Sequence, residues 1–142
     1  MKNIIPYLNF LGNTEEAFTF YKSIFGGEFT TFQRFKDIPN NQHLSNVDQE
    51  KIMHVSLELS NGYVLMGTDM LESMGHKLVE GNNFSLSINA DSESEADFLF
   101  NSLVKGGKID MPLEKTFWGA YFGIVKDKFG IQWLINYDYP NK

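Results

Sequence analysis

TEEAFTFYKSIFGG, residues 14–27, places apolar side chains at helical spacing and ends on two glycines. The pattern predicts an amphipathic helix over residues 14–25, and Gly26-Gly27 suits the left-handed exit that a Cβ would penalise. A second stretch of this design, SEADFLFNSLVKGG, occupies residues 94–107. Overlaying the glycine pairs, which are 80 residues apart, places Phe18 on Phe98 and Phe20 on Phe100. Helix faces and helix ends coincide, which indicates an internal repeat.

The segments around the two helices extend this repeat. One strand-like segment precedes each helix and three follow it, at residues 4–10, 28–35, 51–59 and 63–68, and again at 83–90, 108–113, 121–125 and 131–137. Asn13 with Glu16, and Ser92 with Glu95, are spaced as helix N-caps. The order predicts an α+β fold of two β-α-β-β-β modules, about 3–70 and 82–138, in a single domain of residues 1–142. One helix covers only one face of a sheet, so we expect curved mixed sheets around a cleft.

Composition narrows the class of protein. The chain has 142 residues, 12 basic and 18 acidic, and its net charge of -6 makes nucleic acid and anionic membranes poor partners. The absence of cysteine excludes disulfides, thiolate metal sites and a cysteine nucleophile, and is compatible with a reducing cytoplasm. No signal peptide or long apolar run is visible, so a cytoplasmic location is expected. The aromatic share of 15% predicts a thick core or an apolar cleft.

Strand alternation separates core residues from cleft residues. Over residues 51–59 the apolar side chains fall on one face, while His54, Ser56 and Glu58 fall on the other. The same rule adds polar side chains from residues 83–90 and 131–137. We therefore predict a ligand site of mixed polarity, formed by Leu8, His54, Ser56, Glu58, Met66, Ser85, Ser87, Trp118, Tyr121, Gln132 and Leu134. For Trp118 and Tyr121, a place in a dimer interface is an equal alternative.

The polar stretch over residues 36–50 shows no periodicity and is long for a connection inside a compact domain. It fits either a mobile flap over the site or an inert surface loop. The sequence does not separate these two interpretations.

Several short motifs follow one another along the chain. They are Pro6-Tyr7-Leu8-Asn9-Phe10, Glu15-Glu16-Ala17 before Phe20-Tyr21, Met53-His54, Trp118-Gly119 and DKFGIQW at residues 127–133. Together with the predicted element order, they make the chain resemble the PhnB-like branch of the vicinal oxygen chelate superfamily, over roughly residues 3–137. That superfamily also includes glyoxalase I, extradiol dioxygenases, and bleomycin and fosfomycin resistance proteins. The resemblance implies the two-module fold and a homodimer.

Metal-binding enzymes of that superfamily hold a divalent ion through His, Gln or Glu on the first and fourth strands of each module. The resemblance carries these four places onto Pro6, Met66, Ser85 (or Phe84) and Leu134. Such side chains offer a divalent ion neither a carboxylate nor an imidazole, and one serine hydroxyl cannot hold an ion alone. We therefore expect no metal and no cofactor at this site.

His54 and Glu58 are the candidates for acid–base catalysis. Four residues along a strand separate them by about 13 Å, so they cannot share a proton directly. His54 can act alone or with a cross-strand partner, and a structural histidine bonded to neighbouring strands is the alternative. Glu58 fits a solvated or cross-strand role as well.

The sequence is compatible with three functions. The first is a metal-independent protein that binds a small, partly apolar molecule, similar to the drug-sequestering members of the superfamily. The second is an isomerase or lyase that uses His54, and the third is a dimeric scaffold whose cleft is filled core. Labels attached to relatives, such as phosphonate metabolism and ubiquinone methyl transfer, are not carried over, because the sequence has no methyl-donor motif to support the latter.

Overall fold

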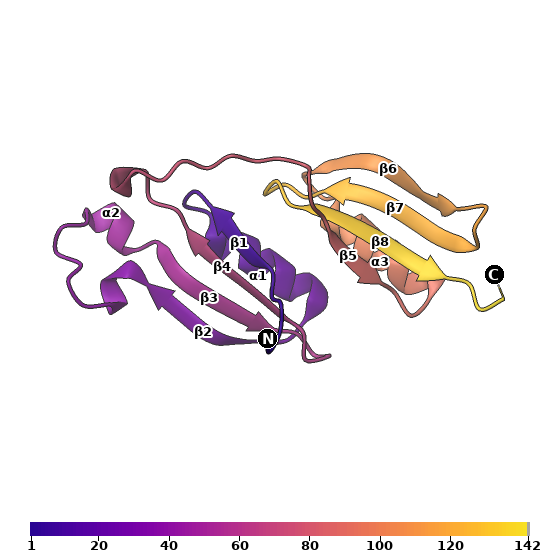
Figure 1. Cartoon of the computed structure of the whole chain (residues 1–142), viewed down its shortest axis with the longest axis horizontal. Helices are drawn as coiled ribbons and strands as arrows, with labels where there is room; N and C mark the ends of the chain where they lie inside the picture. Colours follow the sequence, from indigo (N-terminus) through magenta and orange to yellow (C-terminus); the bar gives the residue numbers. More distant parts are fainter. Residues whose placement is uncertain (142) are drawn as a thin grey trace. The chain divides into compact units, whose positions relative to one another are not determined.

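A computed structural model describes residues 1–141 and divides the chain into two compact modules, with the division between Val79 and Glu80 (Figure 1). Each module follows the predicted order of strand, helix and three strands. The first contains β1 (Tyr7–Phe10), α1 (Thr14–Phe25), β2 (Glu28–Arg34), η1 (Phe35–Asp37), α2 (Asn46–Gln49), β3 (Ile52–Glu58), β4 (Val64–Asp69) and η2 (Glu72–Met74). The second contains β5 (Leu86–Asn89), α3 (Glu93–Leu103), β6 (Lys108–Lys115), β7 (Ala120–Lys126) and β8 (Gln132–Asp138).

Within the described residues each module forms one four-stranded mixed sheet. The strand orders are β1-β4-β3-β2 and β5-β8-β7-β6. The first strand of each module runs parallel to its last strand, and the other neighbours are antiparallel. The predicted α+β class with two β-α-β-β-β modules is therefore confirmed.

In each module the helix covers one face of the sheet. A Cβ added at Gly67 of β4 would lie 2.6 Å from Phe18 Cε1 of α1, so Gly67 faces the helix. Its register partners Leu8 and Val55 share that face and are buried. In the second module Gly123 of β7 faces α3 in the same way, because its Cβ would lie 2.7 Å from Phe100 Cε2. We call the opposite side of each sheet its helix-free face.

The core of the first module is aromatic, as the composition predicted. Phe10, Phe18 and Tyr21 are fully or almost fully buried. The Phe18 ring meets Phe10 and Tyr21 edge to face, at centroid distances of 6.4 and 5.6 Å. These are favourable arrangements for aromatic pairs, and they fix α1 against the sheet.

The predicted overlay of the two helices is wrong by two residues. The buried face of α1 is Thr14, Ala17, Phe18 and Tyr21, and that of α3 is Ala96, Leu99, Phe100 and Leu103, so the matching offset is 82. Phe98 was predicted to match Phe18, but its side chain is 54% exposed. The glycines do keep the offset of 80: Gly27 packs against the Glu58 carbonyl and Gly107 against the Lys126 carbonyl. The connection between helix face and glycine is therefore two residues shorter in the second module.

The N-terminus of α1 is capped by a residue distant in sequence. Asn13 makes no side-chain capping bond, contrary to the prediction. Asp69 of β4 replaces it: one carboxylate oxygen accepts from the Gly12 and Thr14 amides and from the Thr14 hydroxyl. The other oxygen accepts from the Ile52 amide of β3 at 2.8 Å. Asp69 thus joins the helix start to two strands.

The predicted cap of α3 is confirmed at Ser92. Its hydroxyl accepts from the Glu95 amide at 3.0 Å. The Glu95 carboxylate, however, accepts from the Asp91 amide and not from the Ser92 amide that a capping box requires. The local signal was therefore right about where the helix begins.

The structure shortens some predicted strands. β1 begins at Tyr7 rather than at residue 4, since Pro6 has no amide hydrogen and contributes only its carbonyl, which accepts from the Met66 amide. β5 begins at Leu86 rather than at residue 83.

The stretch over residues 36–50 is held by local hydrogen bonds and the short helix α2. The Asn41 side-chain Nδ2 donates to the Lys36 and Ile38 carbonyls, and the Ser45 hydroxyl caps α2 by accepting from the Asp48 backbone amide. The Asp48 carboxylate accepts from Ser73 of η2 at 2.7 Å and from Lys51 at 2.9 Å. A role for this segment as a flap stays a prediction.

Candidate functional site

The helix-free face of the first sheet gathers a group of side chains from its four strands. The register pairs Tyr7 with Met66, Met66 with Ser56, and Glu58 with Val64. On the β2 side it pairs Ser56 with Thr31 and His54 with Gln33. The register also pairs Glu28 with Glu58. With alternation along each strand, this face comprises Tyr7, Asn9, Glu28, Thr31, Gln33, His54, Ser56, Glu58, Val64, Met66 and Thr68.

Four residues of the predicted ligand site, His54, Ser56, Glu58 and Met66, lie on this face. Leu8 does not. It is 3% exposed and pairs with Gly67 on the helix side, where the missing side chain of the glycine leaves room for Phe18. The prediction for Leu8 is wrong, because Tyr7 rather than Leu8 is the β1 neighbour of Met66 on the helix-free face.

Tyr7 and His54 form the most specific polar contact of this face. The Tyr7 hydroxyl oxygen and His54 Nδ1 are 2.9 Å apart, and the two rings are stacked with centroids 5.6 Å apart. The residues come from β1 and β3, which flank β4. From the sequence, His54 was expected to act alone, to act with a cross-strand partner, or to be a structural histidine bonded to neighbouring strands, and Tyr7 is the cross-strand residue that it contacts.

Thr68 of β4 lies between these two strands on the same face. Its hydroxyl donates to the Met53 carbonyl at 2.6 Å. Burial raises the pKa of the Tyr7 phenol above its ordinary value, and the neighbouring Thr68 hydroxyl acts in the opposite direction. With its pKa raised, the Tyr7 phenol keeps its proton at neutral pH.

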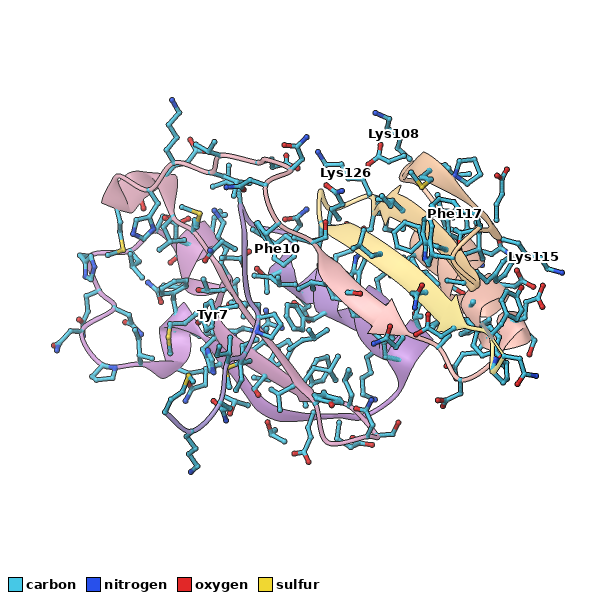
Figure 2. All side chains as sticks on the ribbon, turned by 45° about the vertical axis from the view of Figure 1, so that its right-hand side comes forward. Tyr7, Phe10, Lys108, Lys115, Phe117 and Lys126 are labelled. Atoms are coloured by element: carbon cyan, nitrogen blue, oxygen red, sulfur yellow. The ribbon has the colours of Figure 1, made fainter. Side chains whose placement is uncertain are left out.

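Tyr7 and Thr68 were missed at the sequence level. Side chains alternate between the two faces of a strand. The apolar Leu8 and Phe10 of β1 are buried, so alternation places Tyr7 on the other face. In Figure 2 the labelled Tyr7 and Phe10 mark the two ends of β1, and their exposed fractions are 46% and 2%. The alternation was available in the sequence, whereas the pairing of Tyr7 with His54 depended on the strand order.

In the second module, Ser87, Gln132 and Leu134 lie on the helix-free face. Ser85 precedes β5 and is half-buried. Tyr121 does not belong to this face: its hydroxyl donates to Asp97 of α3 at 2.7 Å, so it lies on the helix side. The cleft prediction for Tyr121 is therefore wrong.

Trp118 lies in the turn between β6 and β7, at the edge of the same face. Its ring meets Phe122, a helix-free-face residue, at 6.2 Å, and Phe117 at 5.0 Å. Phe117 is 97% exposed and Trp118 is 51% exposed. Figure 2 shows Phe117 beside this turn.

Comparison with known proteins adds the family. A family model described as 3-demethylubiquinone-9 3-methyltransferase matches residues 2–136. The chain belongs to this family. It corresponds to the PhnB-like branch of the vicinal oxygen chelate superfamily that the sequence motifs predicted.

Solved structures agree with this assignment. Protein PA1353 from Pseudomonas aeruginosa is 37% identical with a TM-score of 0.86, and the alignment covers 97% of this chain and 98% of that protein. The PhnB protein from Bacillus cereus is 28% identical with a TM-score of 0.78, over 96% and 99% of the two chains. A glyoxalase/bleomycin resistance protein/dioxygenase family enzyme from Burkholderia phytofirmans shares the fold, at 18% identity and a TM-score of 0.61, over 94% and 97%.

The DKFGIQW motif of this PhnB-like chain builds a turn. The Asp127 carboxylate accepts from the Phe129 and Ile131 amides and from the Trp133 indole, with distances of 2.9 to 3.0 Å. Trp133 is buried on the helix side of the sheet. Within this motif, which is the most specific part of the family resemblance, Asp127 and Trp133 therefore have a structural role.

The metal places of the superfamily do not fit a divalent ion in this PhnB-like chain. These places were expected at Pro6, Met66, Ser85 (or Phe84) and Leu134. The register puts Tyr7 rather than Pro6 beside Met66, and Ser87 rather than Ser85 beside Leu134, with Ile124 on the other side of Leu134. A phenol, a thioether and aliphatic side chains do not make a site for a hard divalent ion. Over residues 1–141, no group of three or more His, Cys, Asp or Glu side chains is arranged to hold a metal.

The described helices lack the length and apolarity needed to cross a membrane.

Proposed function

We propose that this chain binds a small, partly apolar molecule on the helix-free face of its first sheet, without a metal ion. Tyr7, His54, Ser56 and Met66 are the proposed binding residues. The observation that carries the proposal is the Tyr7–His54 contact of 2.9 Å beside Met66. It supplies oriented hydrogen-bonding groups next to an apolar side chain, which is the usual composition of a small-molecule site.

The charge of this face supports a neutral ligand. None of its eleven residues is lysine or arginine, and its two carboxylates, Glu28 and Glu58, are paired at the exposed end of β3. An anionic ligand would have no opposite charge here to offset its loss of water. Glu58 stays a candidate contact at the margin of the site.

The remaining predicted binding residues belong to the second module. Ser87, Gln132 and Leu134 stay candidates on its helix-free face, with Ser85 and Trp118 beside them. Phe122, Ile124 and Leu134 are apolar side chains of this face, and Lys126 lies beside Gln132.

A second candidate function is an isomerase or lyase in which His54 moves a proton. The same Tyr7 contact favours it, because a hydrogen bond that orients the imidazole is what a general acid or base requires. Methyl transfer, the activity in the family's description, is not proposed, since no residue motif for a methyl donor supports it. Activity would separate the two candidates: an enzyme loses turnover in His54→Ala, whereas a binding protein has no turnover to lose.

A homodimer is proposed from the family resemblance, and a cytoplasmic location from the absence of cysteine. The exposed Phe117 and Trp118 are compatible with a contact between copies. Light scattering after gel filtration would test it, and a monomer across the accessible concentration range would contradict it.

The experiment for the binding proposal is a thermal-shift screen in the presence of EDTA. Neutral aromatic metabolites, phosphonates, glutathione adducts, fosfomycin and bleomycin-like antibiotics would be compared, since a ligand that binds only the folded state must raise Tm. We expect hits among neutral compounds, lost in His54→Ala and kept in His43→Ala, whose histidine lies exposed in the 36–50 segment. Hits that require a divalent ion would contradict the proposal.

A further inference from the structure

Two lysines lie directly opposite each other at one end of the second sheet. The register pairs Lys108 of β6 with Lys126 of β7, and Lys126 with Gln132 of β8. Because Gly123 of β7 faces the helix, alternation places Lys126 and its two partners on the helix-free face. Like charges in directly opposite positions destabilise a sheet. The pair therefore lowers the stability of the fold unless an anion offsets its charge.

The carboxylates at this end of the sheet leave Lys126 without a partner. Lys108 Nζ lies 3.4 Å from an Asp110 carboxylate oxygen, and the Lys108 side chain is 75% exposed. Asp127, which follows Lys126, turns into the β7–β8 turn and accepts from its backbone amides. Among residues 1–141, Lys126 forms no ion pair although its side chain is half-buried. Its charge is thus free to meet an anion from outside the chain.

The same face is apolar next to the lysines. Ile124 follows Lys126 on this face about 7 Å along the strand, and it lies between Met111 of β6 and Leu134 of β8. Ile124 and Leu134 are half-buried and Met111 is 45% exposed. Phe122 comes next along β7, about 13 Å from Lys126. An apolar strip therefore begins directly beside the cationic end.

The negative charges of this face lie at its other end. Glu114 is the register partner of Phe122, and Asp138 is the partner of Ala120. Along the strands the face thus runs from cationic through apolar to acidic. Such an order fits a ligand with one anionic head group and an apolar body, in a single orientation.

We propose that the helix-free face of the second sheet binds a small amphipathic carboxylate. The head group accepts hydrogen bonds from the ammonium groups of Lys108 and Lys126 and from the Gln132 amide, and such bonds between opposite charges are stronger than neutral ones. The apolar chain lies over Ile124. Glu114 at the far end repels a second negative charge. The ligand class and the module differ from those of the neutral molecule proposed for the first sheet, so either proposal can fail without the other.

Calorimetric titration with octanoate, 1-octanol and acetate separates the head group from the chain. At low salt, octanoate should bind about two- to fivefold more tightly than 1-octanol, because each exposed ion pair contributes modestly. The advantage should shrink as ionic strength rises. Acetate should bind most weakly, since it lacks the chain that is removed from water. Equal affinities for octanoate and 1-octanol, or no binding of octanoate, would overturn the proposal.

Three variants of matched charge locate the head group. Lys126→Gln and Lys108→Gln should each weaken octanoate binding about two- to fivefold and leave 1-octanol unchanged. Lys115→Gln is the control, because Lys115 is at the other end of β6 and lies 5.7 Å from the Tyr139 ring centroid (Figure 2). Its register partner Tyr121 is on the helix side, so octanoate binding should be unchanged. An equal loss in Lys115→Gln would show an effect of net charge alone and would overturn the site.

Two further measurements guard this test. Lys126→Gln relieves the like-charge pair, so urea unfolding should show no loss of stability that could explain weaker binding. Amide NMR of the native chain with octanoate should show its largest changes at Ile124, Lys126 and Gln132. Changes confined to the first module would overturn the proposal.

Discussion

Phe18 of α1 lies over Gly67 of β4 so closely that a Cβ on the glycine would be 2.6 Å from the ring. The second module uses the same solution on a different strand, because Phe100 of α3 lies over Gly123 of β7. In each module a large aromatic ring fills the space that one glycine leaves in the sheet. The contact seats the helix on one face and leaves the other face for the candidate site.

Gly67→Ala should therefore destabilise the chain. The added methyl group meets both the Phe18 ring and the Leu8 carbonyl, and overpacking of this kind costs about 1–3 kcal/mol. Urea unfolding would measure the loss. Gly81→Ala is the control, because its Cβ meets nothing closer than 3.9 Å, and an equal loss there would refute the packing explanation.

Asp69→Asn should loosen the start of α1. The carboxylate receives three backbone amides and one hydroxyl, and it is 3% exposed, while an amide side chain has only one acceptor oxygen. We expect a loss of about 1–3 kcal/mol in the free energy of unfolding. Hydrogen exchange should also accelerate in the first turn of α1. Asp91→Asn, at an exposed position before α3, should show neither effect.

Helix α1 and its cap show which features can be predicted from the sequence and which cannot. Helix α1 was predicted with its observed bounds, because apolar periodicity is a local property. Its cap was assigned to Asn13, since the Asp69 carboxylate reaches it only through the fold. The glycine pairs located both helix exits but misaligned Phe98 with Phe18, because the length of the connection between helix and glycine differs. Tyr7 was missed for a similar reason. Its partner His54 lies on the other side of β4, and the order of the strands in the sheet cannot be read from the spacing of residues along the chain.

The contacts of Asp48 predict that the chain becomes less stable at acidic pH. Hydrogen bonds from Ser73 and Lys51 lower the pKa of the Asp48 carboxyl below its ordinary value of 3.8. A lowered pKa stabilises the folded chain above that value, and the contribution is lost as the pH falls through the lower folded pKa. Urea unfolding of the native chain and Asp48→Asn should differ most above pH 4 and converge below it. Ser73→Ala should show part of the effect, and a difference independent of pH would contradict the assignment.

The contact of Tyr121 with Asp97 predicts that the chain becomes less stable at alkaline pH. Its hydrogen bond to Asp97, with burial, raises the pKa of Tyr121 from 10.0 to about 12. A raised pKa stabilises the folded chain below pH 10, and this contribution is lost as the pH rises toward the folded value. The native chain should therefore lose its advantage over Tyr121→Phe across that interval in urea unfolding. Tyr63→Phe should follow the native chain, and parallel curves for native chain and Tyr121→Phe would show that Tyr121 does not titrate as assigned.

The central claim, that the helix-free face of the first sheet binds a neutral molecule without a metal, is tested most directly by amide NMR. The native chain would be titrated in EDTA with the strongest neutral hit of the thermal screen, and the backbone amide shifts followed. The account predicts that the largest changes fall at Tyr7, His54, Ser56 and Met66, and that His54→Ala weakens them whereas His43→Ala does not. Changes confined to other segments, or present only after a divalent ion is added, would contradict it.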